Sequence, residues 1–214
     1  MKKIYLLLLL CAVFCIVGCD KKQLTARYTA KFDKYIAKHD FEGARKCATK
    51  FPYNRDRKAK LSAANVAEFN YLIDQNSLND AYYLAIELNA KRDLMTAISN
   101  NLLKLLNAGQ AQILLTLLSS WTFTEEYHPE LNYYKYGSGP IEYNTEVKEY
   151  NDLLDGILNY ALFNEDNGLA KKAIRLYQPY VRPVMKKGNW QSNKLVNEAK
   201  DAAVAKAKES GIQL

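Results

Sequence analysis

The sequence is poor in the residues that make tight turns and metal sites. Its 214 residues include 9 glycines and 5 prolines, which is too few for a many-turned β-sandwich and favours helices. Its 2 histidines, His39 and His128, do not stand in the spacing of a metal-binding motif. No nucleophile elbow and no glycine-rich phosphate loop is found. The sequence therefore predicts no metal, no cofactor and no enzymatic activity.

Cysteines are also few, and three of the four fall within the first 19 residues. The chain opens with Met1-Lys2-Lys3, followed by an apolar run from Ile4 to Val17 that is typical of a signal peptide and too short for a comfortable transmembrane helix. The run ends in Ile16-Val17-Gly18-Cys19, which resembles the lipobox of bacterial lipoproteins. This resemblance implies that residues 1–18 are cleaved and that Cys19 is acylated, with residues 19–23 as a short tether to the membrane. Two or more acyl chains hold a protein on a bilayer durably.

The predicted lipid anchor indicates the cell envelope, but it does not determine which membrane, or which face of that membrane, carries the protein. Asp20 resembles the inner-membrane retention signal of enteric bacteria, a rule that fails in other phyla. The pattern is therefore consistent with a cell-envelope lipoprotein of the inner or the outer membrane, facing the periplasm or the surface. Cys47 is then the one free thiol of the mature chain. Because Cys47 shares a helical face with Ala44, Ala48 and Phe51, we expect it to pack as a small hydrophobic residue.

Apolar residues recur at helical spacing nearly everywhere from Leu24 onward, which predicts one all-α domain over residues 24–214. Helix breaks are expected at His39-Asp40, with Asp40 as an N-cap, and at Asn76-Ser77, Asn107–Gly109 and Glu165–Gly168. A last helix is expected at about 193–209. Paired helices joined by such turns predict stacked helical hairpins, that is, a short α-solenoid.

A small residue recurs near the start of each second helix of these pairs, namely Ala44, Ala81, Ala111 and Ala170. Small residues let the two helices of a hairpin approach closely. The pattern resembles the tetratricopeptide class, although the glycine and tyrosine of that motif are mostly missing from the first helices. The resemblance implies a tetratricopeptide-like array with a surface that binds peptides or proteins.

One segment, at about 121–143, interrupts the helical rhythm. It contains Pro129, Gly137, Gly139 and Pro140, and loops of this length in compact domains are usually functional or disordered. Its many aromatic residues argue against disorder. A small β-hairpin over 131–144, turning at Gly137–Gly139, is one expectation. We predict that the segment binds a partner through Trp121, Tyr127, Tyr133, Tyr134 and Tyr136, with Glu125, Glu126 and Glu130 selecting a basic partner. Packing of these rings against the array is the alternative.

Charge is segregated along the mature chain. Residues 20–60 hold 13 basic and 5 acidic side chains, residues 61–170 hold 5 and 15, and residues 171–214 hold 10 and 3. A basic stretch beside a lipid anchor is suited to anionic headgroups, and a solvated helix face is the equally weighted alternative. Nucleic acid is a poor partner for an exported chain without a reading motif.

These observations predict a lipid-anchored binding or scaffold protein of the cell envelope that presents a helical-repeat surface to a protein or peptide partner. Two alternatives stay open. One is a glycan-binding or carbohydrate-active lipoprotein that uses the 121–143 segment, and the other is a purely structural envelope subunit. Fold alone does not choose among them.

Overall fold

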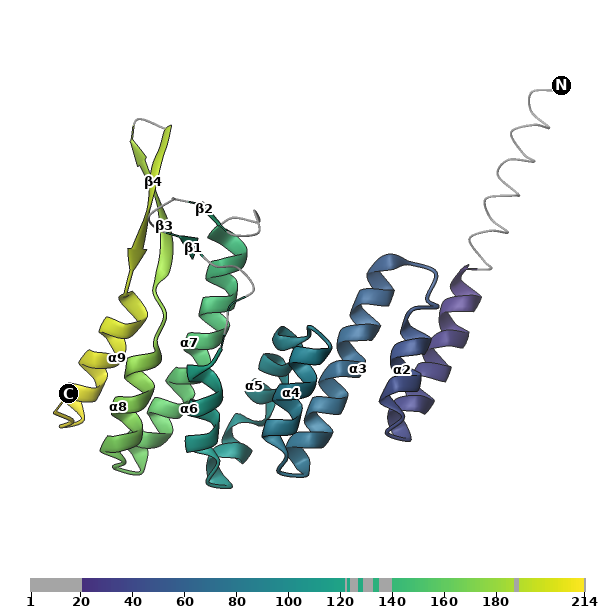
Figure 1. Cartoon of the computed structure of the whole chain (residues 1–214), viewed down its shortest axis with the longest axis horizontal. Helices are drawn as coiled ribbons and strands as arrows, with labels where there is room; N and C mark the ends of the chain where they lie inside the picture. Colours follow the sequence, from purple (N-terminus) through teal and green to yellow (C-terminus); the bar gives the residue numbers. More distant parts are fainter. Residues whose placement is uncertain are drawn as a thin grey trace. The chain divides into compact units, whose positions relative to one another are not determined.

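The computed structural model describes residues 21–121, 123, 127–128, 133–134, 140–186 and 189–213. Most of these residues are helical, and the helices pack as adjacent pairs (Figure 1). The chain divides into two compact units. The first contains the described residues up to Gln75 together with Leu84–Ala97, and the second contains Asn76–Tyr83 and the described residues from Ile98 onward.

The first unit begins with a helix over residues 21–37, which we call helix 21–37. It continues with α2 (Phe41–Ala48), which packs against α3 (Asn54–Asp74). A core of buried side chains joins these three helices: Phe32, Ala44, Cys47, Ala48, Phe51 and Ala64. The boundary between the two units falls within α4 (Leu78–Glu87) and within α5 (Lys91–Asn107).

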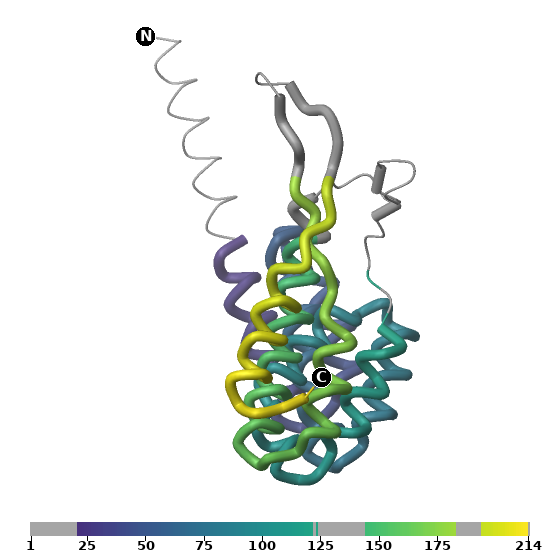
Figure 2. The backbone as a smooth tube through the Cα atoms, turned by 90° about the vertical axis from the view of Figure 1, so that its left-hand side faces the viewer, coloured from purple at the N-terminus to yellow at the C-terminus, as the bar shows by residue number. Residues whose placement is uncertain are grey.

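The second unit is built around α7 (Pro140–Phe163), which packs against α8 (Asn167–Leu176). Helix α6 (Ala111–Ser119) contacts α8, and α9 (Glu198–Glu209) runs beside α7 and α8 (Figures 1 and 2). Leu153, Leu154, Ile157 and Leu158 of α7 are all buried. Their spacing over two turns is that of the apolar face of an amphipathic helix.

The same turn joins helices at four places. His39, Asn89, Gly109 and Glu165 have φ values of 56°, 51°, 74° and 57°, in the left-handed region. In each case the next amide donates to the carbonyl five residues back, as in Asp40 N to Tyr35 O at 3.0 Å and Asp166 N to Ala161 O at 2.8 Å. This is the Schellman arrangement, which satisfies the carbonyls at the end of a helix. The predicted breaks at His39-Asp40 and Asn107–Gly109 are therefore confirmed. The break predicted at Glu165–Gly168 is also found but is shorter, since α8 already begins at Asn167. The N-cap of Asp40 is confirmed as well, because its side chain accepts from Gly43 N at 2.9 Å.

The prediction of an all-α chain is wrong between residues 180 and 196. Strands β3 (Tyr180–Lys186) and β4 (Asn189–Val196) form an antiparallel hairpin, with Val181 opposite Leu195 and an irregularity between Val184 and Met185. Consequently the last helix begins at Glu198 rather than near 193. Pro183 lies in β3, and proline is tolerated in an edge strand because the missing N–H need not pair.

Two asparagines of α7 hold the chain where it enters this hairpin, and we call them the asparagine clamp. Asn151 Nδ2 donates to Gln178 O at 2.9 Å, and Gln178 N donates to Asn151 Oδ1 at 3.0 Å. Asn144 makes the same pair of bonds with the amide and the carbonyl of Val181, both at 2.8 Å. The two asparagines are seven residues apart, so they lie on one face of α7. They satisfy backbone groups that would otherwise lack a partner.

The predicted hairpin over 131–144 is also wrong. The observed pairing is earlier and shorter, between β1 (Tyr127–His128) and β2 (Tyr133–Tyr134), with Tyr127 opposite Tyr134. Residues 140–144 belong to α7, which begins at Pro140 because proline suits the first turn of a helix. The irregular insertion therefore ends before 140 rather than at about 143, and the turn expected at Gly137–Gly139 lies outside the described residues.

Candidate functional site

The predicted partner-binding residues are only partly described. Cys19, Glu125, Glu126, Glu130 and Tyr136 lie outside the described residues. Tyr127, Tyr133 and Tyr134 are placed by their backbone in β1 and β2, and their side chains lie outside the description.

Trp121 is fully described, and its ring is buried within the protein instead of being exposed to a partner. Its exposed fraction is 7%, and its Nε1 lies 3.4 Å from the Glu146 carboxylate, to which it donates. Next to it, Phe123 meets Tyr150 edge-on with ring centroids 5.2 Å apart. The start of the insertion is thus fixed to α7 by aromatic packing.

Cys47 is buried, as predicted, in the core of the first unit. Its Sγ lies 3.6 Å from Tyr28 O. Burial raises the pKa of the thiol, which keeps it protonated and unreactive near neutral pH.

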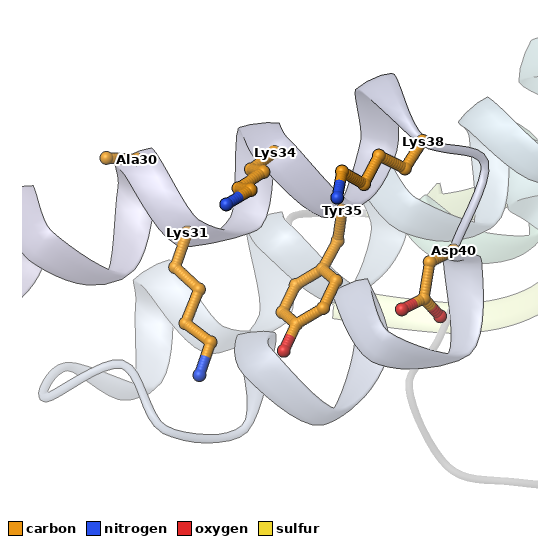
Figure 3. A pocket seen from close by; sticks show the side chains of 6 residues that line it. All are labelled: Ala30, Lys31, Lys34, Tyr35, Lys38 and Asp40. Atoms are coloured by element: carbon orange, nitrogen blue, oxygen red, sulfur yellow. The ribbon is translucent and has the colours of Figure 1, made fainter.

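A groove with a basic edge runs along helix 21–37, and we call it the lysine groove. Its volume is about 590 Å³. It is lined by Ala30, Lys31, Lys34, Tyr35, Lys38 and Asp40 (Figure 3). Lys31 and Lys34 project from the helix, and Lys38 belongs to the turn that follows it.

Helical periodicity explains this edge. Arg27, Lys31, Lys34 and Lys38 follow one another at spacings of four, three and four residues, so they form one stripe along the helix. Phe32, which is buried, lies on the adjoining face with Tyr28 and Ile36. The basic stripe is therefore the edge of an amphipathic helix whose apolar face is already covered. The charge of residues 20–60 indicates a basic region, whereas the stripe within it depends on the helical spacing of its members.

A smaller groove of about 160 Å³ continues the lysine groove toward α2 and shares Lys31 and Tyr35 with it. Its other lining residues are Gly43, Lys46, Cys47 and Lys50. Lys31 Nζ lies 5.7 Å from the centroid of the Tyr35 ring, a distance typical of a cation–π contact. Lysines of both helices therefore surround one tyrosine.

Acidic groups near these lysines already have partners. Asp40 caps α2, Glu42 forms an ion pair with Lys46, and Asp33 lies 3.7 Å from Lys60 Nζ. The Glu42 pKa is lowered by its hydrogen bond and charge interaction with Lys46. No acidic residue other than Asp40 lines either groove. The lysine groove is thus suited to an anion.

A second groove, which we call the tyrosine groove, lies between α4 and α6 in the second unit. Its volume is about 250 Å³. Tyr83 is 69% exposed and Ile113 is 42% exposed. The Tyr82 hydroxyl donates to Ser120 O at 3.5 Å and accepts from Ser120 Oγ at 3.3 Å. The groove is lined by Asn79, Tyr82, Tyr83, Ile113, Thr116, Leu117 and Ser120, none of which is charged.

Sequence reasoning missed the tyrosine groove, because its two sets of lining residues, 79–83 and 113–120, are far apart in the sequence. The adjacent pair Tyr82-Tyr83 was its one local signal. Among the residues that the structure describes, no three His, Cys, Asp or Glu side chains gather as a metal site. Within the same residues, no helix combines the length and the apolar character needed to cross a bilayer.

Comparison of the chain with protein-family models, with curated proteins and with solved structures yields no match.

Proposed function

We propose that this protein is a lipid-anchored binding or scaffold protein of the bacterial cell envelope, held by Cys19 and presenting stacked helical pairs to a protein or peptide partner. The lipobox residues 16–19 support the anchor. The tetratricopeptide-like array is supported by the recurring alanines, whose exposed fractions are 0% for Ala44, Ala81 and Ala170 and 8% for Ala111. Burial at these positions is what close approach of paired helices requires.

The tyrosine groove is the observation that carries the binding role. Large rings that stay exposed in a concave surface are typical of contact sites, because tyrosine supplies much contact area with little loss of conformational entropy. Tyr83 and Ile113 offer an apolar contact, while Asn79, Thr116 and Ser120 offer neutral hydrogen-bonding groups. A bound peptide needs both, because its apolar side chains need an apolar contact and its backbone amides need hydrogen-bonding partners.

The insertion, which begins at Trp121 and ends before Pro140, remains part of the proposal. It begins immediately after Ser120, a lining residue of the tyrosine groove. Tyr127, Tyr133, Tyr134 and Tyr136 then extend the contact, with Glu125, Glu126 and Glu130 selecting a basic partner. Trp121, being buried, supports the root of the segment instead of touching the partner.

The anchor is tested by Cys19→Ser. The substitution removes the sulfur that carries the acyl chains, so we expect no incorporation of labelled palmitate and either uncleaved precursor or released protein. Cys47→Ser is the matched control and should leave labelling intact. Membrane retention and labelling that persist in the Cys19→Ser protein would contradict the anchor.

The binding role is tested by Tyr83→Ala in affinity capture from crosslinked envelopes. We expect loss of the captured partner with a melting temperature close to that of the parent protein, since substitutions of exposed residues usually change stability by less than about 0.5 kcal/mol. Phe163→Ala is the matched control, because Phe163 is an exposed aromatic residue, 87% accessible, outside the groove. Equal capture by Tyr83→Ala would remove the groove from the proposal. Binding to purified envelope glycan that depends on Tyr83 would favour the glycan alternative.

A further inference from the structure

The lysine groove has more positive charge than the rest of its unit neutralises. Its three lysines belong to one stripe with Arg27, and Lys46 and Lys50 stand across Tyr35 on the side of α2. Of the nearby carboxylates, Asp33 lies beside Lys60, Glu42 is paired with Lys46, and Asp40, at the end of the groove, caps α2. Within the described residues, Lys31, Lys34 and Lys38 therefore keep their charge without an ion-pair partner. Ammonium groups that line one groove can each donate hydrogen bonds to a phosphate.

The end of helix 21–37 nearest Cys19 has a different composition. Lys21 Nζ lies 5.8 Å from the centroid of the Tyr53 ring, which places Tyr53 beside the first described residue. Tyr53 is 44% exposed and Leu24 is 43% exposed. Exposed aromatic and aliphatic side chains interleaved with lysines are typical of the boundary between a bilayer and water.

The length of the intervening chain limits where these groups can be. Residue 21 is helical and stands two positions after Cys19 in the sequence. A helix rises 1.5 Å per residue, which puts Lys38 about 26 Å from residue 21 along the axis. Attraction to headgroups fades over a Debye length, about 8 Å at physiological ionic strength. The stripe therefore reaches the headgroups along its whole length only when helix 21–37 lies along the membrane surface.

We infer that the lysine groove binds the anionic phospholipid headgroups of the membrane that carries Cys19, with helix 21–37 lying along that surface. The inference rests on the proposed acylation of Cys19. An anionic bilayer is favoured over an acidic protein segment because the short tether holds the groove beside headgroups at high local concentration. Leu24, which is exposed and stands three residues before Arg27, also continues the basic stripe toward Cys19.

The test is amine labelling of the lipidated protein, reconstituted into phosphatidylcholine vesicles with and without phosphatidylglycerol and read by mass spectrometry. Lys31, Lys34 and Lys38 should be labelled several-fold more slowly when phosphatidylglycerol is present. Protection should disappear at about 1 M salt, where the Debye length falls to about 3 Å. Lys194 and Lys208, exposed lysines of the second unit, serve as internal controls and should be labelled equally in both vesicles.

The outcomes separate the anchor from the groove. Protein that associates with neither kind of vesicle contradicts the acylation. Protein that inserts into both, with equal labelling of the three lysines, overturns the inference. Protection by a soluble oligoglutamate peptide on pure phosphatidylcholine, without protection by phosphatidylglycerol, assigns the groove to an acidic protein segment and also overturns it.

A triple variant tests the inference independently, through retention on vesicles. The protein in which Lys31, Lys34 and Lys38 are all replaced by glutamine should lose phosphatidylglycerol-dependent retention when its acyl chains are removed. Its affinity for such vesicles should fall on the order of 100-fold if each lysine contributes about fivefold. Replacing Lys104, Lys194 and Lys208 by glutamine removes the same charge elsewhere and should change little. Equal losses in the two variants would show that net charge, rather than the groove, is responsible.

Discussion

At the scale of single residues, the core of the first unit shows which sequence signals are reliable. Helical spacing alone predicts that Cys47, Ala44 and Ala48 lie together, and all three are buried. The N-cap of Asp40 was equally readable, because a capping aspartate needs only an amide three residues ahead. Both features depend on neighbours in the same helix.

Replacing Cys47 tests this packing. Cys47→Ala removes one buried sulfur and should lower the free energy of unfolding by about 1 kcal/mol. Cys47→Asp buries an unpaired carboxylate among apolar side chains and should cost roughly 3 kcal/mol or more. Urea denaturation measures both. Rapid alkylation of the folded wild-type protein at neutral pH would contradict the buried, protonated thiol.

Glu165 offers a second test, because it is a non-glycine residue in the left-handed region, at φ 57°. Glu165→Gly should raise the free energy of unfolding by about 0.5–1 kcal/mol, since glycine adopts this conformation without a clash between Cβ and the backbone. Glu165→Ala is the control, because alanine keeps its Cβ, and it should bring no gain. Equal gains from glycine and alanine would show that the loss of the carboxylate, and not backbone relief, stabilises the turn.

At the scale of elements, the sequence predicted the helical pairs and their turns but not the β3–β4 hairpin. Pro183 argues against a strand, and the apolar residues Val181 and Val184 are too few to reveal an alternation. The asparagine clamp could not be predicted from the sequence for another reason. Asn144 and Val181 are 37 positions apart, and no local pattern links a polar residue of a helix to a backbone amide at that distance.

The asparagine clamp should contribute measurably to the free energy of unfolding. Asn151 is 1% exposed, and Asn151→Ala leaves the N–H and C=O of Gln178 without their partners. We expect a loss of about 2–3 kcal/mol, the cost of unsatisfied buried polar groups. Asn167→Ala, at an exposed position of α8, should change stability by less than about 0.5 kcal/mol. Thermal unfolding of the two variants compares them, and similar midpoints would contradict the role assigned to the clamp.

At the scale of the whole molecule, the two units do not follow each other along the chain. After Gln75 the chain enters the second unit with Asn76–Tyr83 and then returns to the first unit with Leu84–Ala97. Asp93, in this returning segment, accepts hydrogen bonds from Ser62 Oγ at 2.5 Å and from Asn65 Nδ2 at 2.8 Å. The tyrosine groove depends on the same kind of long-range packing, which is why helical periodicity could not reveal it.

Fragments of the chain test this division. A fragment of residues 20–75 lacks the partner of Ser62 and Asn65, whereas a fragment of residues 20–97 retains it. We expect the longer fragment to show a stronger helical signal per residue in circular dichroism and a cooperative thermal transition, and the shorter one to unfold gradually. A 20–97 fragment in which Asp93 is replaced by alanine controls for length. If all three fragments melt alike, Leu84–Ala97 is not needed by the first unit.

The asparagine clamp also bears on self-association through the pairing of strands from two copies. A two-stranded sheet has open edges, and unpaired N–H and C=O groups on an edge are a template on which another chain can add a strand. Both groups of Val181 that point away from β4 are occupied by Asn144. A side chain from a helix thus does for the start of β3 what a neighbouring strand would do. The bonds to Asn144 thus block the addition of another chain's strand at Val181.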